Sequence, residues 1–209
     1  MFQANTRILK WLLFFSIFSF QVVAQNGDAP DLPENFSEKM PIYSEALGPL
    51  SWKISSKNDS AQMYFDQGLQ LKYAFGVRDA ARSFHEAQKH DPNSAIAYWG
   101  EAWAWGAYLN GRLSEENAPR AYAAIRKALK LAKKNASPLE KDLIEAMKVR
   151  YVKEFDPEKR KDQDTAYAEK MKKLYEKYPG NLEVATIYAE AIFLLEPRRG
   201  YRDIESPSI

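Results

Sequence analysis

The chain has 209 residues, no cysteine, and 30 lysine and arginine residues against 28 aspartate and glutamate residues. This length is enough for one domain with a sizeable core. The absence of cysteine excludes a disulfide framework and cysteine-based structural metal sites, so stability must come from helix packing.

Residues 1–24 have the features of a secretory signal peptide. Arg7 and Lys10 form a positive start, an apolar run follows, and Val22 and Ala24 are small residues at the positions that signal peptidase reads. We therefore predict cleavage after Ala24 and a periplasmic or secreted protein. The alternative is an uncleaved membrane anchor, although the apolar run is short for a span.

Cleavage after residue 24 would remove two basic residues and leave 28 basic and 28 acidic ones. A chain of zero net charge gives no electrostatic reason to expect a nucleic-acid partner or binding to an anionic membrane surface. We expect no membrane span after cleavage.

Residues 25–58 contain four prolines and no sustained helical period. We predict an extended lead-in with a short helix at residues 42–46. Residues 50–54 should lie against the helices that follow, because Trp52 and Ile54 would be costly to leave in water. The alternative is a disordered arm.

Residues 61–94 have the length and spacing of one helix-turn-helix repeat of the tetratricopeptide (TPR) type, which has a period of 34 residues. The matching residues are Gly68, Ala80, Phe84, Ala87 and Pro92. Gly68 offers a notch without a side chain and Ala80 a methyl group, so two helices can approach closely while Phe84 fills the space beside them. The alternative is an ordinary helical hairpin in a bundle.

The turn of this repeat has its own signals. Gly76 stands where the first helix should end and can take a positive φ, and Asp79 favours the start of the second helix. Pro92 cannot continue that helix.

The next predicted pair comprises residues 95–109 and 118–134. Their connection, residues 110–117, is longer than a standard repeat turn, so this unit is stretched.

A third unit is predicted to begin at Ser137, which forms a capping box with Glu140. Its first helix should run to about residue 153, and its second should span residues 164–178. Asn181 should then cap a last helix over residues 182–195.

This last helix has apolar residues around most of its circumference, whereas a terminal helix of a repeat array needs a polar outer face. We therefore expect further chain to cover it, with a dimer contact as the alternative. Residues 197–209 have no helical period and are predicted to be a flexible tail.

Residues 63–110, with the runs YFDQGLQLKYAF and AARSFHEAQKHDPNSAIAYWGEAWAWGAYLN, resemble secreted multi-repeat TPR proteins of bacterial envelopes. The resemblance covers roughly residues 50–195 and loosens after the first unit. It implies an all-α, TPR-like α-solenoid of about three antiparallel helix pairs plus one final helix, over residues 59–196. It also implies that the chain is the N-terminal part of a longer family member with a binding or scaffolding role.

We find no motif for catalysis, metal or cofactor binding, and we predict that the protein is not an enzyme. His85-Glu86 and His90 resemble a zinc-protease pattern, but a spacing of five residues makes the two imidazoles diverge on a helix. We interpret both histidines as solvent-side residues. The common phosphate-binding loops and the hydrolase nucleophile elbow are absent from the sequence.

The predicted binding site is an aromatic concave groove formed by one stripe of each repeat. Its residues are Phe65, Leu69, Lys72, Tyr73, Trp99, Trp103, Leu143, Met147, Arg150 and Tyr151. Exposed Trp pairs are favourable anchors for an apolar peptide or a sugar face. The alternative is that the aromatic group Tyr98, Trp99, Trp103, Trp105 and Tyr108 belongs to the core.

The first functional hypothesis is a protein-interaction module that binds a protein or peptide partner in this groove. Phe65 and Leu69 replace the residues with which chaperone-binding TPR domains clamp a carboxylate, so that type of recognition is not expected. The alternatives are a protein that stacks a glycan or small molecule on Trp99 and Trp103, or a non-catalytic front end of a larger envelope enzyme.

Overall fold

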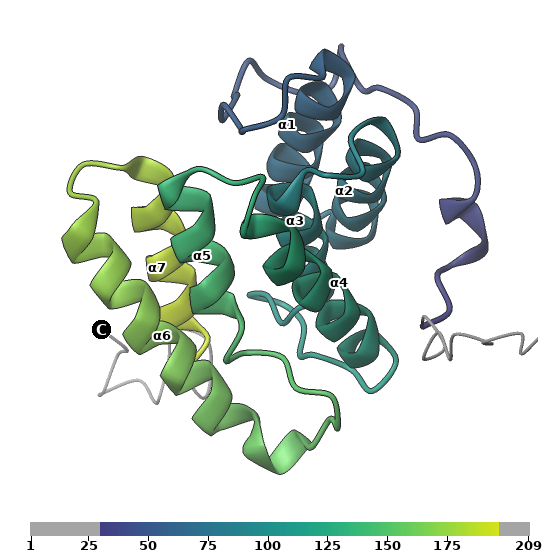
Figure 1. Ribbon diagram of the computed structural model, residues 1–209. Helices are drawn as coiled ribbons and strands as arrows, with labels where there is room; N and C mark the ends of the chain where they lie inside the picture. The colour runs from purple at the N-terminus through teal and green to yellow at the C-terminus, as the bar shows by residue number, and fades with distance from the viewer. Residues whose placement is uncertain (1–29, 197–209) are drawn as a thin grey trace, which may run out of the picture.

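The computed structural model describes residues 30–196, and its regular elements in that range are all helical (Figure 1). They are η1 (Glu34–Phe36), α1 (Asp59–Tyr73), α2 (Val77–His90), α3 (Ala95–Trp105), α4 (Asn117–Ala132), α5 (Pro138–Met147), η2 (Pro157–Lys159), α6 (Arg160–Lys177) and α7 (Leu182–Phe193). The all-α prediction is confirmed for these residues. The predicted signal peptide and tail lie outside the described residues.

The helices pack as neighbouring pairs, as the sequence predicts. α1 packs on α2 and α3 on α4, while α2 also packs on α3 and thereby joins the two pairs. The third pair is looser, because α6 packs more extensively on α7 than on α5. Figure 1 shows α6 and α7 side by side on the opposite side of α5 from α2.

The close approach of α1, α2 and α3 depends on the ring of Phe84. A Cβ added to Gly68 would lie 2.8 Å from this ring, and a Cβ added to Gly100 would lie 2.5 Å from it. Phe84 therefore occupies the notch at Gly68, with a second notch on α3. Ala80 and Ala87, on the same helix as Phe84, are also completely buried.

The turn between α1 and α2 differs from the prediction at one position. Gly76 has a φ of −76°, and the positive φ of 63° belongs to Phe75. Phe75 N–H donates to the Lys72 carbonyl and Gly76 N–H donates to the Leu71 carbonyl. These two bonds form a Schellman motif, whose left-handed residue is the one before Gly76.

Two helices end earlier than their periodicity predicts. α3 ends at Trp105 rather than at residue 109, because the chain turns at Gly106 and closes a bridge between Tyr108 and Gly111. α5 ends at Met147 rather than near residue 153, and Arg150, beyond its end, turns into the protein interior.

The starts of α5 and α7 agree with the sequence prediction more closely than the ends of α3 and α5 do. The Ser137 capping box with Glu140 and the Asn181 cap of α7 are both confirmed. α6 is an exception, since it begins at Arg160 rather than at residue 164. Because the added first turn is helical, Arg160 and Asp164, which are four residues apart, lie on the same face of α6 and form an ion pair.

The lead-in is bound to α1. Trp52 N–H donates to Asp66 Oδ1 at 2.9 Å, Ile54 N–H donates to Gln62 Oε1 at 3.0 Å, and Ile54 is buried. The prediction for residues 50–54 is thus confirmed. The short helix predicted at residues 42–46 is only a turn, and the lead-in helix is instead η1.

Between residues 30 and 196, no helix combines the length and the apolar character needed to cross a membrane.

Candidate functional site

The side chains predicted to line an open groove are mostly buried. Phe65, Leu69, Lys72, Trp99, Trp103, Leu143, Met147, Arg150 and Tyr151 expose 4% of their surface or less, and Tyr73 is half-buried. The prediction that these residues line an open groove is therefore wrong. Elements from both ends of the domain cover the face that they share.

The lead-in covers one part of this face through Trp52. Its ring lies edge-on to Phe65 at 5.8 Å and to Trp99 at 6.0 Å between ring centroids. Trp99 stacks in turn on Trp103, with centroids 5.3 Å apart. The alternative that the aromatic group belongs to the core therefore holds for Trp99, Trp103 and Trp105, while Tyr98 and Tyr108 are half-buried.

α7 covers the other part through Glu190. The Glu190 carboxylate accepts hydrogen bonds from Lys72 Nζ at 2.9 Å and from Trp103 Nε1 at 2.6 Å. Burial lowers the pKa of Lys72, and the nearby Glu190 carboxylate opposes that change. One carboxylate on α7 thus joins the ends of α1 and α3, which lie about a hundred residues earlier in the chain.

A second carboxylate on α7 binds the next residue of α1. Tyr73 Oη donates a hydrogen bond to Glu183. Burial raises the pKa of Tyr73, and the Glu183 carboxylate raises it further because it stabilises the protonated phenol. Tyr73 therefore remains a neutral donor at physiological pH.

An apolar pocket of about 350 Å³ remains open where α1, α3 and α7 meet. We call it the α1–α7 pocket, and its lining residues are Lys72, Tyr73, Phe75, Trp103, Leu109, Thr186, Ala189, Glu190, Phe193 and Leu194. Three of the predicted groove residues are among them. Sequence reasoning missed the α7 residues, because it placed this helix at the end of the array instead of against α1.

Phe75 is the most accessible aromatic residue of this pocket, with 48% of its surface exposed. Its left-handed backbone conformation at the end of α1 turns the side chain away from the helix and toward Tyr108, whose ring centroid lies 6.4 Å away. The only sequence signal near this position was Gly76, which we interpreted as the end of the first helix, and Phe75 was not identified.

The remaining predicted groove cation, Arg150, is completely buried. Its Nε donates to Asp164 Oδ1 at 3.2 Å and its Nη2 to the Ala107 carbonyl at 3.1 Å, while its Nη1 has no hydrogen-bond partner among the described residues. Although burial lowers the pKa of Arg150, neighbouring groups that include Tyr151 and Asp164 reverse that effect and raise it. The guanidinium therefore stays charged inside the protein.

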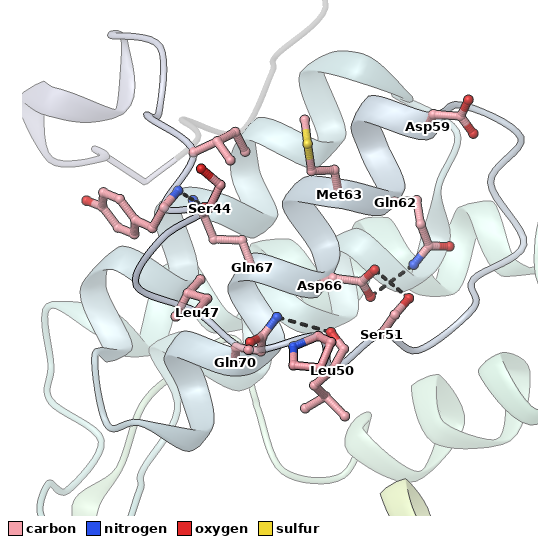
Figure 2. A pocket seen from close by; sticks show the side chains of 14 residues that line it. Ser44, Leu47, Leu50, Ser51, Asp59, Gln62, Met63, Asp66, Gln67 and Gln70 are labelled. Atoms are coloured by element: carbon pink, nitrogen blue, oxygen red, sulfur yellow. Dashed lines mark hydrogen bonds between the residues drawn. The ribbon is translucent and has the colours of Figure 1, made fainter.

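A further pocket, of about 410 Å³, lies between residues 42–51 of the lead-in and α1 (Figure 2). Its polar side chains are already used to hold the lead-in. Gln67 accepts a hydrogen bond from Tyr43 N–H, and Gln70 donates one to the Leu50 carbonyl. Figure 2 shows Asp66 directed toward Ser51 and Gln62, with which it forms hydrogen bonds. The pocket is therefore the space left between the lead-in and α1, and its polar side chains serve to hold these two segments together.

The two histidines are half-buried, so their interpretation as solvent-side residues is wrong. His85 Nδ1 lies 3.5 Å from a Glu101 carboxylate oxygen, and the His90 ring stacks on Tyr64 at 5.3 Å between centroids. Within residues 30–196, no group of three or more metal-ligating side chains of the His, Cys, Asp and Glu types is close enough to hold a metal ion.

Comparisons with protein-family models, with curated proteins and with solved structures found no match. The resemblance to secreted TPR proteins therefore stays a prediction from the sequence.

Proposed function

We propose that the protein is a binding module built as a TPR-like α-solenoid, which holds a protein or peptide segment by an apolar anchor side chain inserted in the α1–α7 pocket. The observation that carries this proposal is the pocket itself, which is apolar, open and adjacent to the exposed ring of Phe75. A periplasmic or secreted location remains part of the proposal and depends on the signal-like residues 1–24.

The size of the pocket favours a single anchor group. Its volume of about 350 Å³ is near the lower end of the range of about 300–1,000 Å³ for ligand sites. Binding energy in protein interfaces is concentrated in a few aromatic or apolar side chains that fill such pockets. One large apolar residue of the partner, flanked by weaker contacts, is therefore the recognition that we expect.

The charges of the pocket support the same occupant. Lys72 and Glu190 form an ion pair with each other, and Trp103 Nε1 is also bound to Glu190. A charged partner group would lose its hydration without gaining an unpaired counter-charge there. An apolar group has no such cost.

The glycan alternative has less support, because it needs the faces of Trp99 and Trp103 to be accessible. Trp99 exposes none of its surface and Trp103 exposes 1%. The alternative of a front end for a larger enzyme also has no site residue in its favour among residues 30–196.

The proposal can be tested by selecting peptides from a random display library against the full chain. We expect the selected peptides to share one aromatic or large aliphatic residue, and we expect Phe75→Asn to weaken their binding about tenfold in fluorescence anisotropy. Asn is chosen because it tolerates the left-handed backbone at this position. Ala189→Phe, which places a ring in the pocket, should weaken binding by a similar factor.

Tyr175→Asn provides the matched control, since Tyr175 is an aromatic residue of similar exposure, at 46%, on α6. It should leave peptide binding unchanged. Selected peptides without a shared apolar residue, or equal binding by the Phe75 and Tyr175 variants, would contradict the proposal.

A further inference from the structure

A third pocket, of about 840 Å³, lies between the α3–α4 connection, the start of α6 and the residues after α7, and we call it the cationic pocket. Its lining residues are Ala107, Tyr108, Gly111, Arg112 and Leu113 after α3, Phe155, Pro157, Arg160, Lys161 and Asp164 around the start of α6, and Leu194, Leu195 and Glu196 after α7. Figure 1 shows the α3–α4 and α5–α6 connections at the same end of the molecule.

Positive charge exceeds negative charge in this pocket. Arg112, Arg160 and Lys161 line it, together with the carboxylates of Asp164 and Glu196. Arg112 and Lys161 are exposed and form no ion pair with a described residue.

The carboxylate of Asp164 is already shared by two cations. Arg160 Nη2 and Arg150 Nε both donate to its Oδ1 atom. Arg150 is fully buried and the Arg160 side chain is 13% exposed, so neither charge is strongly screened by water. Burial lowers the pKa of Arg160, against the opposing effect of Asp164. One carboxylate for two guanidinium groups leaves an excess positive charge in the wall.

Behind two of the lining residues, Ala107 and Asp164, the buried Arg150 side chain and its neighbours include polar atoms without a hydrogen-bond partner. Arg150 Nη1 and the hydroxyls of Tyr151 and Tyr167 are buried and have no hydrogen-bond partner among the described residues. The two hydroxyls can donate or accept, whereas the guanidinium can only donate, so Arg150 Nη1 is a buried cationic donor without an acceptor among the described residues. Arg150 itself fixes two groups of the lining, the Asp164 carboxylate and the Ala107 carbonyl, which makes this side of the pocket rigid.

The rest of the lining is apolar. Leu113 and Phe155 contribute from one side, and Leu194 and Leu195 contribute from the end of α7. A pocket of this volume with one charged wall and an apolar remainder fits a ligand that has one charged head and an apolar body.

We propose that the cationic pocket binds a small organic carboxylate with an aliphatic or aromatic body. The carboxylate accepts hydrogen bonds from Arg112, Arg160 and Lys161, and the apolar body lies against Leu113, Phe155 and the leucines after α7. This site adjoins the α1–α7 pocket, because Leu194 lines both, but its charged residues are different. The proposal does not depend on the proposed peptide binding.

The test is calorimetric titration of the full chain with octanoate, beside 1-octanol and acetate. We expect octanoate to bind at least about tenfold more tightly than octanol, which lacks the charge, or acetate, which lacks the body. The double substitution Arg112→Gln with Lys161→Gln should weaken octanoate binding about tenfold while leaving the melting temperature unchanged, because both side chains are exposed and form no ion pair within residues 30–196.

The matched control is Arg126→Gln with Lys130→Gln, which removes the same charge from exposed positions on α4. It should bind octanoate as the unmodified chain does. Absence of octanoate binding, equal affinity for octanol, or equal weakening in the two double variants would overturn the proposal. Loss of octanoate binding in Ala189→Phe alone, a position that lines only the α1–α7 pocket, would place the ligand there and would also overturn it.

Discussion

The front half of the domain, α1 to α4, and the rear half, α5 to α7, both bury apolar side chains, but they differ in what else their helix contacts contain. In the front half, Phe84 packs between Gly68 and Gly100, and alanines fill much of the rest of the interface. In the rear half, a buried guanidinium, Arg150, and the shared carboxylate of Asp164 lie at the centre of the interface.

This difference shows what each half contributes. Close apolar packing gains stability from every buried contact, whereas buried ion pairs roughly balance their desolvation cost and define a geometry. The front half therefore serves as the stable scaffold. The rear half provides the polar contacts by which α7 is positioned on α1 and α3, and the α1–α7 pocket is lined by the residues that make them.

The largest expected effect is in the front half, where Phe84→Ala should lower the free energy of unfolding by about 3–5 kcal/mol, because it removes a buried ring between three helices. Urea denaturation followed by circular dichroism measures the change.

A double-mutant cycle sharpens this prediction. Gly100→Ala alone should cost about 1–3 kcal/mol, since the new methyl group would meet the Phe84 ring. In the Phe84→Ala background the same substitution should cost much less, because the ring is gone. Additive effects of the two substitutions would show that the ring does not occupy the Gly100 notch.

The next effect concerns the contact between the halves. Glu190→Gln should destabilise the protein by about 2 kcal/mol, because it leaves the Lys72 ammonium buried without its counter-charge. The loss is smaller than for a fully buried pair, because Glu190 is partly exposed. Adding Lys72→Met to this variant should recover most of the loss, since no unpaired charge remains.

Glu183→Gln is the control on the same helix. Glu183 binds the neutral Tyr73 hydroxyl and leaves no buried cation behind, so its substitution should cost less than about 1 kcal/mol. Equal losses for the two glutamate variants in chemical denaturation would mean that charge pairing does not position α7.

The smallest effect is expected within the rear half, at Asp142. Burial alone would raise the pKa of Asp142, but hydrogen bonds from Lys177 and Tyr178 outweigh it and lower the pKa below its ordinary value of 3.8. The resulting stability is fully present above the unfolded-state pKa and is lost as the pH falls through the folded-state pKa.

We therefore expect Asp142 to contribute less than about 1 kcal/mol above pH 4, since the contact is open to solvent. The difference in unfolding free energy between the unmodified chain and Asp142→Asn should shrink as the pH falls below that value. A difference that stays constant between pH 6 and pH 3 would contradict the assigned pKa direction.

The sequence by itself determined the local structure of this protein. Apolar periodicity, the caps at Ser137 and Asn181 and the small residue at Gly68 act within one helix or one hairpin, so their consequences could be predicted from neighbouring residues. The same local signals failed where a distant contact intervened, as at the early end of α5, beyond which Arg150 is bound by Ala107 and Asp164.

Only the tertiary structure decided which inward-facing residues stay accessible. Periodicity identified the stripe that contains Lys72, Tyr73 and Trp103, but not the α7 carboxylates that cover it from more than 80 residues away. Whether a helix face becomes a groove or a core depends on which other element reaches it, and that depends on the summed curvature of all the helix pairs between them.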